Sequence, residues 1–174
     1  PHKTIAKVRL LLKKGNHVTK EWPDGWATKS KSGSCVYLAC EFVVLSGQYE
    51  NRKIWSNIAL HSDNSKKYGE IGRSMIRAIL NSANSLHSKD KSPEAEKQRQ
   101  IKSFADLDNL ICVAEVTIND KGDSPRNEIK TIITPDHAKY SEYMDERSGK
   151  FPISYGSTSN RQSTGELISD EIPF

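Results

Sequence analysis

The segment from Cys35 to His61 constrains the fold most, because apolar and polar side chains alternate almost strictly along both of its arms. Such a period of two is typical of β-strands with one buried and one open face. Residues 47–51, Gly-Gln-Tyr-Glu-Asn, separate the arms and predict the turn of a β-hairpin. We expect its inner face to carry Val36, Leu38, Cys40, Phe42, Val44, Ile54, Ile58 and Leu60.

The outer face of this hairpin has the composition of a binding surface. Its second arm places Lys53, Trp55 and Asn57 there, and its first arm places Tyr37 and Glu41 there. An exposed tryptophan beside a lysine lowers solubility unless it binds something, and unpaired nucleic-acid bases stack well on such rings. The alternative is that Trp55 packs beneath a loop or covers the end of a barrel.

Three further segments predict strands by the same alternation: residues 4–14, 110–119 and 127–134. In the second of these we expect Ile118 to face inward with Val116. In the third we expect Ile129, Thr131 and Ile133 inward. The basic side chains expected on the outer faces are Lys7, Arg9 and Lys13 of the first strand and Lys130 of the last.

From Lys66 to about Ser85 the apolar period becomes helical, with Ile71, Met75, Ile79 and Ala83 on one face. We expect this helix to pack on the open bottom of a barrel. Residues 85–105 then form a charged insertion, in which Ser92-Pro93 favours a helix start. A solvated helix is the expected role of this insertion, and phosphate contacts by Lys97, Arg99 and Lys102 are the alternative.

Residues 15–34 form a long loop in which Trp22 and Trp26 alternate with lysines. Loops of this length in a small domain are usually functional or disordered. We therefore expect at least one of the two indoles to meet the ligand. The alternative for Trp22 is that the turn Pro23-Asp24-Gly25 folds it back over a barrel end.

The order of elements is three strands, a helix, an insertion and two strands, which is the order of the OB-fold, a five-stranded Greek-key barrel. In that fold the outer face of strands two and three binds single-stranded nucleic acid. We expect a mainly β chain with an OB-fold domain at 1–135 (insertion 85–105). A short helical extension at 136–153 and a flexible linker with a disordered acidic tail at 154–174 follow.

Charge supports a polyanion partner. The net charge is +4, but residues 156–174 carry one arginine against three acidic residues, so residues 1–155 hold +6. The three cysteines do not make a disulfide framework, and Cys35 and Cys40 face opposite sides of one strand, which argues against a shared metal. The chain has no bilayer-spanning apolar run and no signal-peptide pattern, so we expect a cytoplasmic protein with no membrane partner.

An enzyme, such as a nuclease or a recombination enzyme, is the first alternative function. It needs clustered carboxylates or a histidine constellation, whereas the five histidines are scattered and Glu41 and Glu115 stand on different strands. We therefore expect a non-enzymatic protein with no catalytic residues, no metal and no cofactor. An RNA-binding or protein-only OB module is the second alternative, since stacking and phosphate contacts serve either nucleic acid.

The chain ends Ser169-Asp170-Glu171-Ile172-Pro173-Phe174, which resembles the C-terminal tip of bacterial single-stranded-DNA-binding proteins. The resemblance implies that this tip recruits replication, recombination and repair proteins. The ring of Phe174 would fill an apolar pocket, its carboxylate would meet a basic residue, and Asp170 and Glu171 would steer the encounter. The other interpretation of the tip is an acidic end with no such role.

The run Gly47 to Trp55, the following helix and Asn127-Glu128-Ile129-Lys130 are similar to a family of phage-encoded OB-fold single-stranded-DNA binders from recombination cassettes. The similarity covers residues 36–134 and departs from the family at 85–105. It implies a protein of a phage or mobile element, acting on DNA in the bacterial host cell, and leaves open whether it forms a homo-oligomer. The candidate DNA-binding residues are Trp55, Lys53, Arg52, Tyr37, Asn57, Trp22, Trp26, Lys7, Arg9 and Lys130, and the partner-binding tip comprises Asp170, Glu171, Ile172, Pro173 and Phe174.

Overall fold

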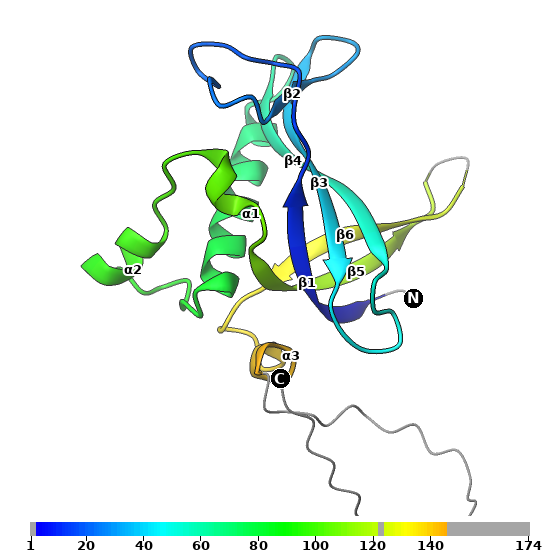
Figure 1. Cartoon of the computed structure of the whole chain (residues 1–174), viewed down its shortest axis with the longest axis vertical. Helices are drawn as coiled ribbons and strands as arrows, with labels where there is room; N and C mark the ends of the chain where they lie inside the picture. The colour runs from blue at the N-terminus through cyan, green and yellow to red at the C-terminus, as the bar shows by residue number, and fades with distance from the viewer. Residues whose placement is uncertain (1–2, 122–123, 146–174) are drawn as a thin grey trace, which may run out of the picture.

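One antiparallel sheet organises the protein (Figure 1), and the computed structural model describes residues 3–121 and 124–145. Without the short strand β2, which also pairs with β3, neighbouring strands follow the order β4–β3–β1–β5–β6. Consecutive strands pair through the β3–β4 and β5–β6 hairpins, and β1 joins the two hairpins. The strands are β1 (Thr4–Leu12), β2 (Ala27–Lys29), β3 (Cys35–Val44), β4 (Lys53–Ser62), β5 (Ile111–Asn119) and β6 (Arg126–Ile133).

The sheet has six strands where the sequence predicted five, because β2 lies inside the expected loop 15–34. Strand β3 extends beyond the end of its pairing with β1. β1 pairs with residues 40–44 of β3, and β2 pairs with residues 36–38 along the same edge of β3. A short strand thus satisfies backbone groups that β1 leaves free. The sheet is also open: β4 and β6 lie against each other, but no hydrogen-bonded ladder joins them in the described part of the chain.

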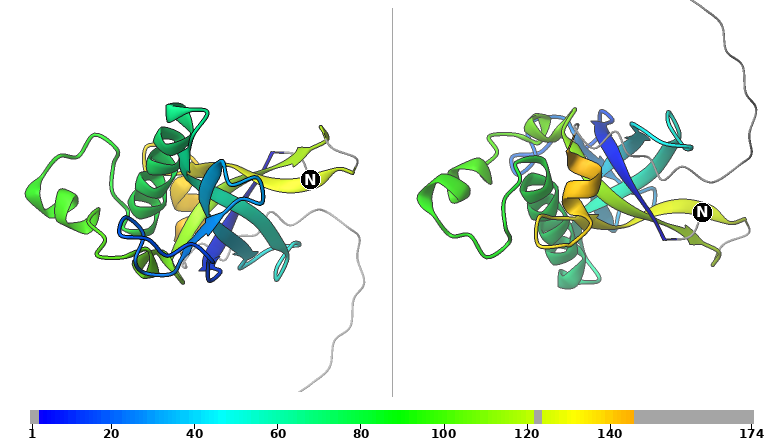
Figure 2. Two further views of the ribbon diagram at one scale, coloured as in Figure 1. Left: turned by 90° about the horizontal axis from the view of Figure 1, so that it is seen from above. Right: turned by 90° about the horizontal axis from the view of Figure 1, so that it is seen from below.

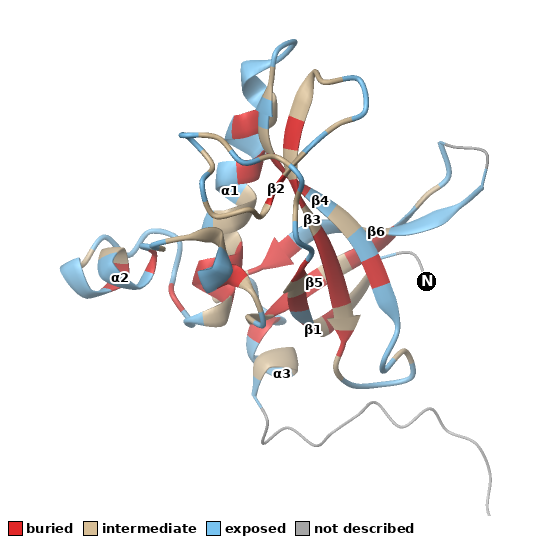
Figure 3. Ribbon diagram, turned by 45° about the horizontal axis from the view of Figure 1, so that its top comes forward, coloured by how far each residue is buried: buried red, intermediate tan, exposed pale blue. Residues whose placement is uncertain are grey.

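The core lies between the concave side of this sheet and helix α1 (Lys66–Ala83). Buried residues recur along the strands of the sheet (Figure 3). All of the inner residues predicted for the first arm of the hairpin are buried, as are Ile54 and Ile58 of the second arm, so the phase of this hairpin is confirmed as far as Ile58. A register shift follows, and Leu60, also predicted inward, is only partly buried.

Helix α1 is rotated from its predicted orientation. Ile71, expected in the core, is 65% exposed, while Gly69 and Gly72 are buried against β4. A Cβ atom on Gly72 would lie 1.5 Å from the carbonyl oxygen of Ala59, so only glycine permits this approach. Near Gly69 and Gly72 the helix therefore meets the sheet through its backbone, and farther along it packs with large buried side chains such as Ile79.

A bulge changes the phase of the β5–β6 hairpin. Glu115 pairs with Thr131 and Val116 pairs with Ile129, so Lys130 is an extra residue in the ladder. Consequently Thr131, predicted to face inward, is exposed, and Ile132 takes its place in the core. Ile133, also predicted inward, instead packs in a second cluster with Val113. Ile118, also predicted inward, is 39% exposed because this end of the hairpin extends beyond the core (Figure 2).

The insertion forms α2 (Pro93–Gln98) and a 3-10 turn, η1 (Phe104–Leu107), and α2 projects from the body of the protein (Figure 1). The helix start at Ser92 is confirmed, because its side chain accepts a hydrogen bond from the Ala95 amide. Arg99 is not solvated: its Nε donates to Asn81 Oδ1 at 2.8 Å and its Nη2 to the His87 carbonyl at 2.9 Å. Arg99 therefore anchors the insertion to α1 and is not available to phosphate.

The predicted helix after β6 is α3 (Tyr140–Met144), which contacts β1 and β5. Tyr140 is buried with Val113 and Ile133 in a small second cluster on the outer side of the sheet. Its hydroxyl donates a hydrogen bond to the Ser82 carbonyl of α1. Within the described residues, no helix has the length and apolar character needed to cross a membrane.

Candidate nucleic-acid interface

The outer side of the sheet that α3 leaves uncovered presents three rows of side chains across β1, β3 and β4. The ladders align Arg9 with Val43 and Lys53, and align Leu11 with Glu41 and Trp55. In the third row the Lys13 amide donates to the Ala39 carbonyl, and Ala39 pairs with Asn57. We call this surface the open face; it comprises Arg9, Leu11, Lys13, Ala39, Glu41, Val43, Lys53, Trp55 and Asn57.

Trp55 stands in the middle row with 61% of its surface exposed. The alternative that it packs beneath a loop or closes a barrel end is therefore wrong. The ammonium of Lys13 lies 5.2 Å from the centroid of its ring, within the range of a cation–π contact. Since Asn57 and Lys53 flank it on β4 and both are exposed, the ring and the polar groups form one accessible surface.

Glu41 pairs with Trp55 across the ladder and is only 1% exposed. Lys53 Nζ lies 3.0 Å from its Oε1, and Lys13 Nζ lies 3.2 Å from its Oε2. The hydrogen bond from Lys53, with a further contribution from Lys13, lowers the pKa of the Glu41 carboxyl. The open face therefore contains a covered carboxylate between two exposed ammonium groups.

Tyr37 continues this surface along β3, opposite Ala59 of β4 and Thr28 of β2, but it is half-buried. Trp22 lies farther along: its ring is 5.6 Å from that of His17 and 6.3 Å from that of His61, centroid to centroid. His61 belongs to β4, so the indole of Trp22 lies beside the same strand that carries Trp55.

Trp26 has a structural position. It packs against the hydrophobic core, and the ammonium of Lys14 lies 3.7 Å from the centroid of its ring. The loop before it is tied down by Asp24, which accepts from the amides of Trp26 and Phe104. Trp26, rather than Trp22, therefore covers part of the core. The core contacts one side of the Trp26 ring and Lys14 lies over the other, so few positions remain where a base could stack on it.

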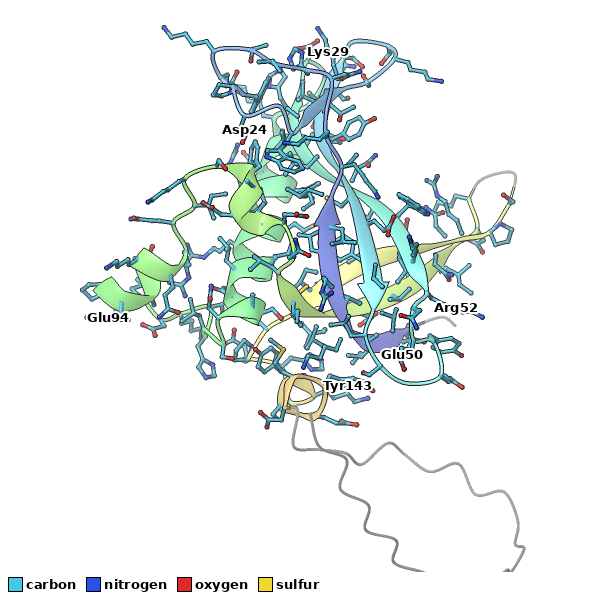
Figure 4. The ribbon with its side chains drawn as sticks, in the orientation of Figure 1. Asp24, Lys29, Glu50, Arg52, Glu94 and Tyr143 are labelled. Carbon is cyan, nitrogen blue, oxygen red and sulfur yellow. The ribbon has the colours of Figure 1, made fainter. Side chains whose placement is uncertain are left out.

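Three predicted basic residues lie apart from Trp55. Arg52 lies in the β3–β4 turn (Figure 4), where its guanidinium is 5.2 Å from the Tyr49 ring centroid and lines a small apolar cavity with Ile54 and Val116. Lys7 donates to the Met144 carbonyl at 3.3 Å, beneath α3. Lys130 donates to Glu115 at 2.9 Å on the far hairpin.

The described residues contain no group of three or more histidine, cysteine, aspartate or glutamate side chains that could hold a metal ion. Asp106 caps η1, and Asp108 accepts from the Leu12 amide at 2.8 Å, so both act in turns.

Cys40 and Cys112 are free and buried, and burial raises the pKa of each thiol to about 12. The tip residues Asp170, Glu171, Ile172, Pro173 and Phe174 lie outside the described residues.

Sequence reasoning placed Lys13 on the outer face but did not include it among the candidate DNA-binding residues, and it missed the burial of the Glu41 carboxylate. Lys13 continues the alternation of Lys7 and Arg9, which was the available signal. The burial of Glu41 had no local signal, because it depends on lysines from two other segments.

Neither a protein-family model nor a curated protein matches this chain.

Proposed function

We propose that this protein binds single-stranded DNA without catalysing a reaction on it. A base stacks on Trp55, and Arg9, Lys13 and Lys53 neutralise the neighbouring phosphates. The observation that carries this proposal is the exposed indole among three cationic side chains on an uncovered sheet surface. Such a surface binds unpaired strands with little sequence preference, because every base has a flat face.

The strand order supports an OB-like architecture. Apart from β2, the neighbours β4–β3–β1–β5–β6 and the position of α1 between β4 and β5 follow the order of that fold. We propose that the approach of β4 to β6 corresponds to the seam of its barrel. On this proposal the open face includes the outer surface of β3 and β4, which correspond to the two strands that bind nucleic acid in OB-folds, and extends onto β1.

The proposal includes recruitment of other proteins. The acidic end Asp170-Glu171-Ile172-Pro173-Phe174 would bind basic, apolar pockets of replication and recombination proteins, as its resemblance to bacterial tips implies. On this proposal the protein is encoded by a phage or mobile element and acts on DNA in the cytoplasm of a bacterial host. Deleting residues 172–174 should abolish partner recruitment and leave DNA affinity equal or higher.

A fluorescence titration with dT oligomers of graded length at two salt concentrations tests the DNA-binding proposal. We expect quenching of tryptophan emission and a steep loss of affinity with salt, since phosphates are being neutralised. Competition with RNA of equal sequence distinguishes DNA from RNA binding, and a magnesium-dependent cleavage assay tests for a nuclease. If the oligomers neither quench the fluorescence nor change in anisotropy at low salt, the proposed function is wrong.

A further inference from the structure

The centre of the open face contains a negative charge, which is unexpected on a surface for a polyanion. Glu41 lies between Lys13 and Lys53, and the three groups together carry a net charge of +1 rather than +2. Both lysines are about half exposed, at 46% and 58% of their side chains, while the Glu41 side chain is 2% exposed. The lysines thus cover the carboxylate and remain accessible to a ligand.

We propose that Glu41 is an internal counterion that competes with nucleic-acid phosphates for Lys13 and Lys53. This inference rests on the proposed function and adds a mechanism that limits affinity. In the free protein both ammonium groups are bound to the carboxylate. When a strand binds, each ammonium must share its hydrogen bonds between Glu41 and a phosphate, and the carboxylate repels that phosphate.

The position of Lys13 links this exchange to base stacking. Lys13 Nζ lies 3.2 Å from Glu41 Oε2, slightly farther than Lys53 Nζ lies from Oε1, at 3.0 Å. Lys13 is held both by this carboxylate and by the ring of Trp55, over which its ammonium lies. A base that stacks on that face of the ring must move Lys13 outward, toward the phosphates. Stacking and ion exchange at Lys13 are thus parts of one event.

A second carboxylate–lysine pair provides a matched control on the same sheet. Glu115 of β5 accepts a hydrogen bond from Lys130 at 2.9 Å, and this bond lowers the pKa of the Glu115 carboxyl. The pair lies on the β5–β6 hairpin, outside the open face. Replacing either glutamate with glutamine changes the net charge by the same amount, so only the position differs.

The experiment compares the affinity of full-length wild type, Glu41→Gln and Glu115→Gln for a fluorescent dT oligomer at several salt concentrations. Glu41→Gln should bind about five- to tenfold more tightly at low salt, because one nearby unit charge opposing the phosphates is removed. Its salt dependence should steepen by about 0.7 in the slope of log K against log salt, equivalent to one more neutralised phosphate. Glu115→Gln should change the affinity by less than about twofold, since Glu115 lies on β5, outside the open face, and salt weakens its effect on a strand bound there.

Equal behaviour of the two variants, or weaker binding by Glu41→Gln, would overturn the internal counterion. Wild type that fails to bind the oligomer would instead disprove the proposed function itself. If Glu41→Gln does not fold, lysine variants decide the matter: Lys13→Met and Lys53→Met should each cost less affinity than Arg9→Met. Arg9 is exposed and has no ion-pair partner among the described residues, so its charge is fully available. Lysine losses as large as the arginine loss would contradict the proposal.

Discussion

The outer surface of the sheet has two halves that differ in what covers them. The half formed by the start of β1 with β5 and β6 carries Val113 and Ile133, and α3 packs on it through Tyr140. The other half, the open face, carries Leu11, Ala39 and Val43 among charged side chains, and within the described residues no helix packs on it. A continuous apolar surface binds a segment of its own chain, whereas apolar side chains separated by charged ones leave the surface uncovered.

The two halves contain the same charge motif with different numbers of partners. Glu115 has Lys130 as its hydrogen-bonded partner, whereas Glu41 is enclosed by two lysines and an indole. Both carboxyl pKa values are lowered for the same reason, a hydrogen bond from a lysine. The two ion pairs therefore differ in their surroundings and not in residue type: Glu115–Lys130 lies on the half of the sheet that α3 covers, and Glu41 with its two lysines lies on the open face.

The largest expected effect tests the covered half. Tyr140→Ala removes a buried ring and its hydrogen bond to Ser82, so the free energy of unfolding should fall by about 3 kcal/mol. Affinity for single-stranded DNA should stay nearly unchanged, because α3 lies outside the open face. Urea denaturation and dT binding measure the two quantities, and Tyr143→Ala, at a half-buried position, should cost less stability. A large loss of DNA affinity by folded Tyr140→Ala would show that the halves are not independent.

Trp55→Ala should have the opposite pattern. Loss of stacking should weaken dT binding by about 1–3 kcal/mol, and the free energy of unfolding should change by less than about 0.5 kcal/mol because the ring is exposed. Ile71→Ala provides the control, since Ile71 is similarly exposed at 65% but belongs to α1 rather than to the open face. Unchanged affinity in Trp55→Ala would remove the observation on which the proposed function rests.

The alternating segments of this chain were predictable because their two faces differ locally. The phase of the β3–β4 hairpin and the exposure of Trp55 follow from side chains that are close in sequence. The rotation of α1 does not, because it depends on Gly72 meeting the carbonyl of Ala59 on another strand. The spacing of Gly69 and Gly72 on one helix face was the only signal, and the stripe of large apolar residues outweighed it in the prediction.

The site was predictable in outline but not in its electrostatics. Arg9, Lys53, Trp55 and Asn57 lie together as expected, since neighbouring strands align their outer faces. Lys7 and Lys130 belong to the same alternation, yet α3 and the bulge at Lys130 give them other environments. Periodicity indicates the side of a sheet on which a residue lies; which half of that side is covered depends on contacts distant in sequence.

Two substitutions that each remove one positive charge, one on the open face and one on the covered half, test whether the two halves of the sheet differ in their effect on DNA binding. Arg9→Met should weaken dT binding about threefold and flatten the salt dependence by about 0.7 in the log–log slope, because one phosphate contact is lost. Lys130→Met removes the same charge from the covered half and should leave both quantities nearly unchanged. Anisotropy titrations at three salt concentrations measure both. Equal effects of the two substitutions would indicate that the protein attracts DNA through its overall charge rather than through the open face.

The smallest expected effect concerns acid stability. Both glutamates have a pKa below the ordinary value of 4.5, so each should stabilise the fold above that value and lose this contribution as the pH falls through the lowered pKa. Glu41 has two lysine partners, whereas Glu115 has one hydrogen-bonded lysine. The free energy of unfolding of wild type should be higher at pH 7 than at pH 3, and Glu41→Gln should reduce this difference more than Glu115→Gln does. Urea denaturation at the two pH values measures this difference. If Glu115→Gln removes as much as Glu41→Gln, the second lysine at Glu41 adds no stability, and Lys13 is held mainly by the ring of Trp55.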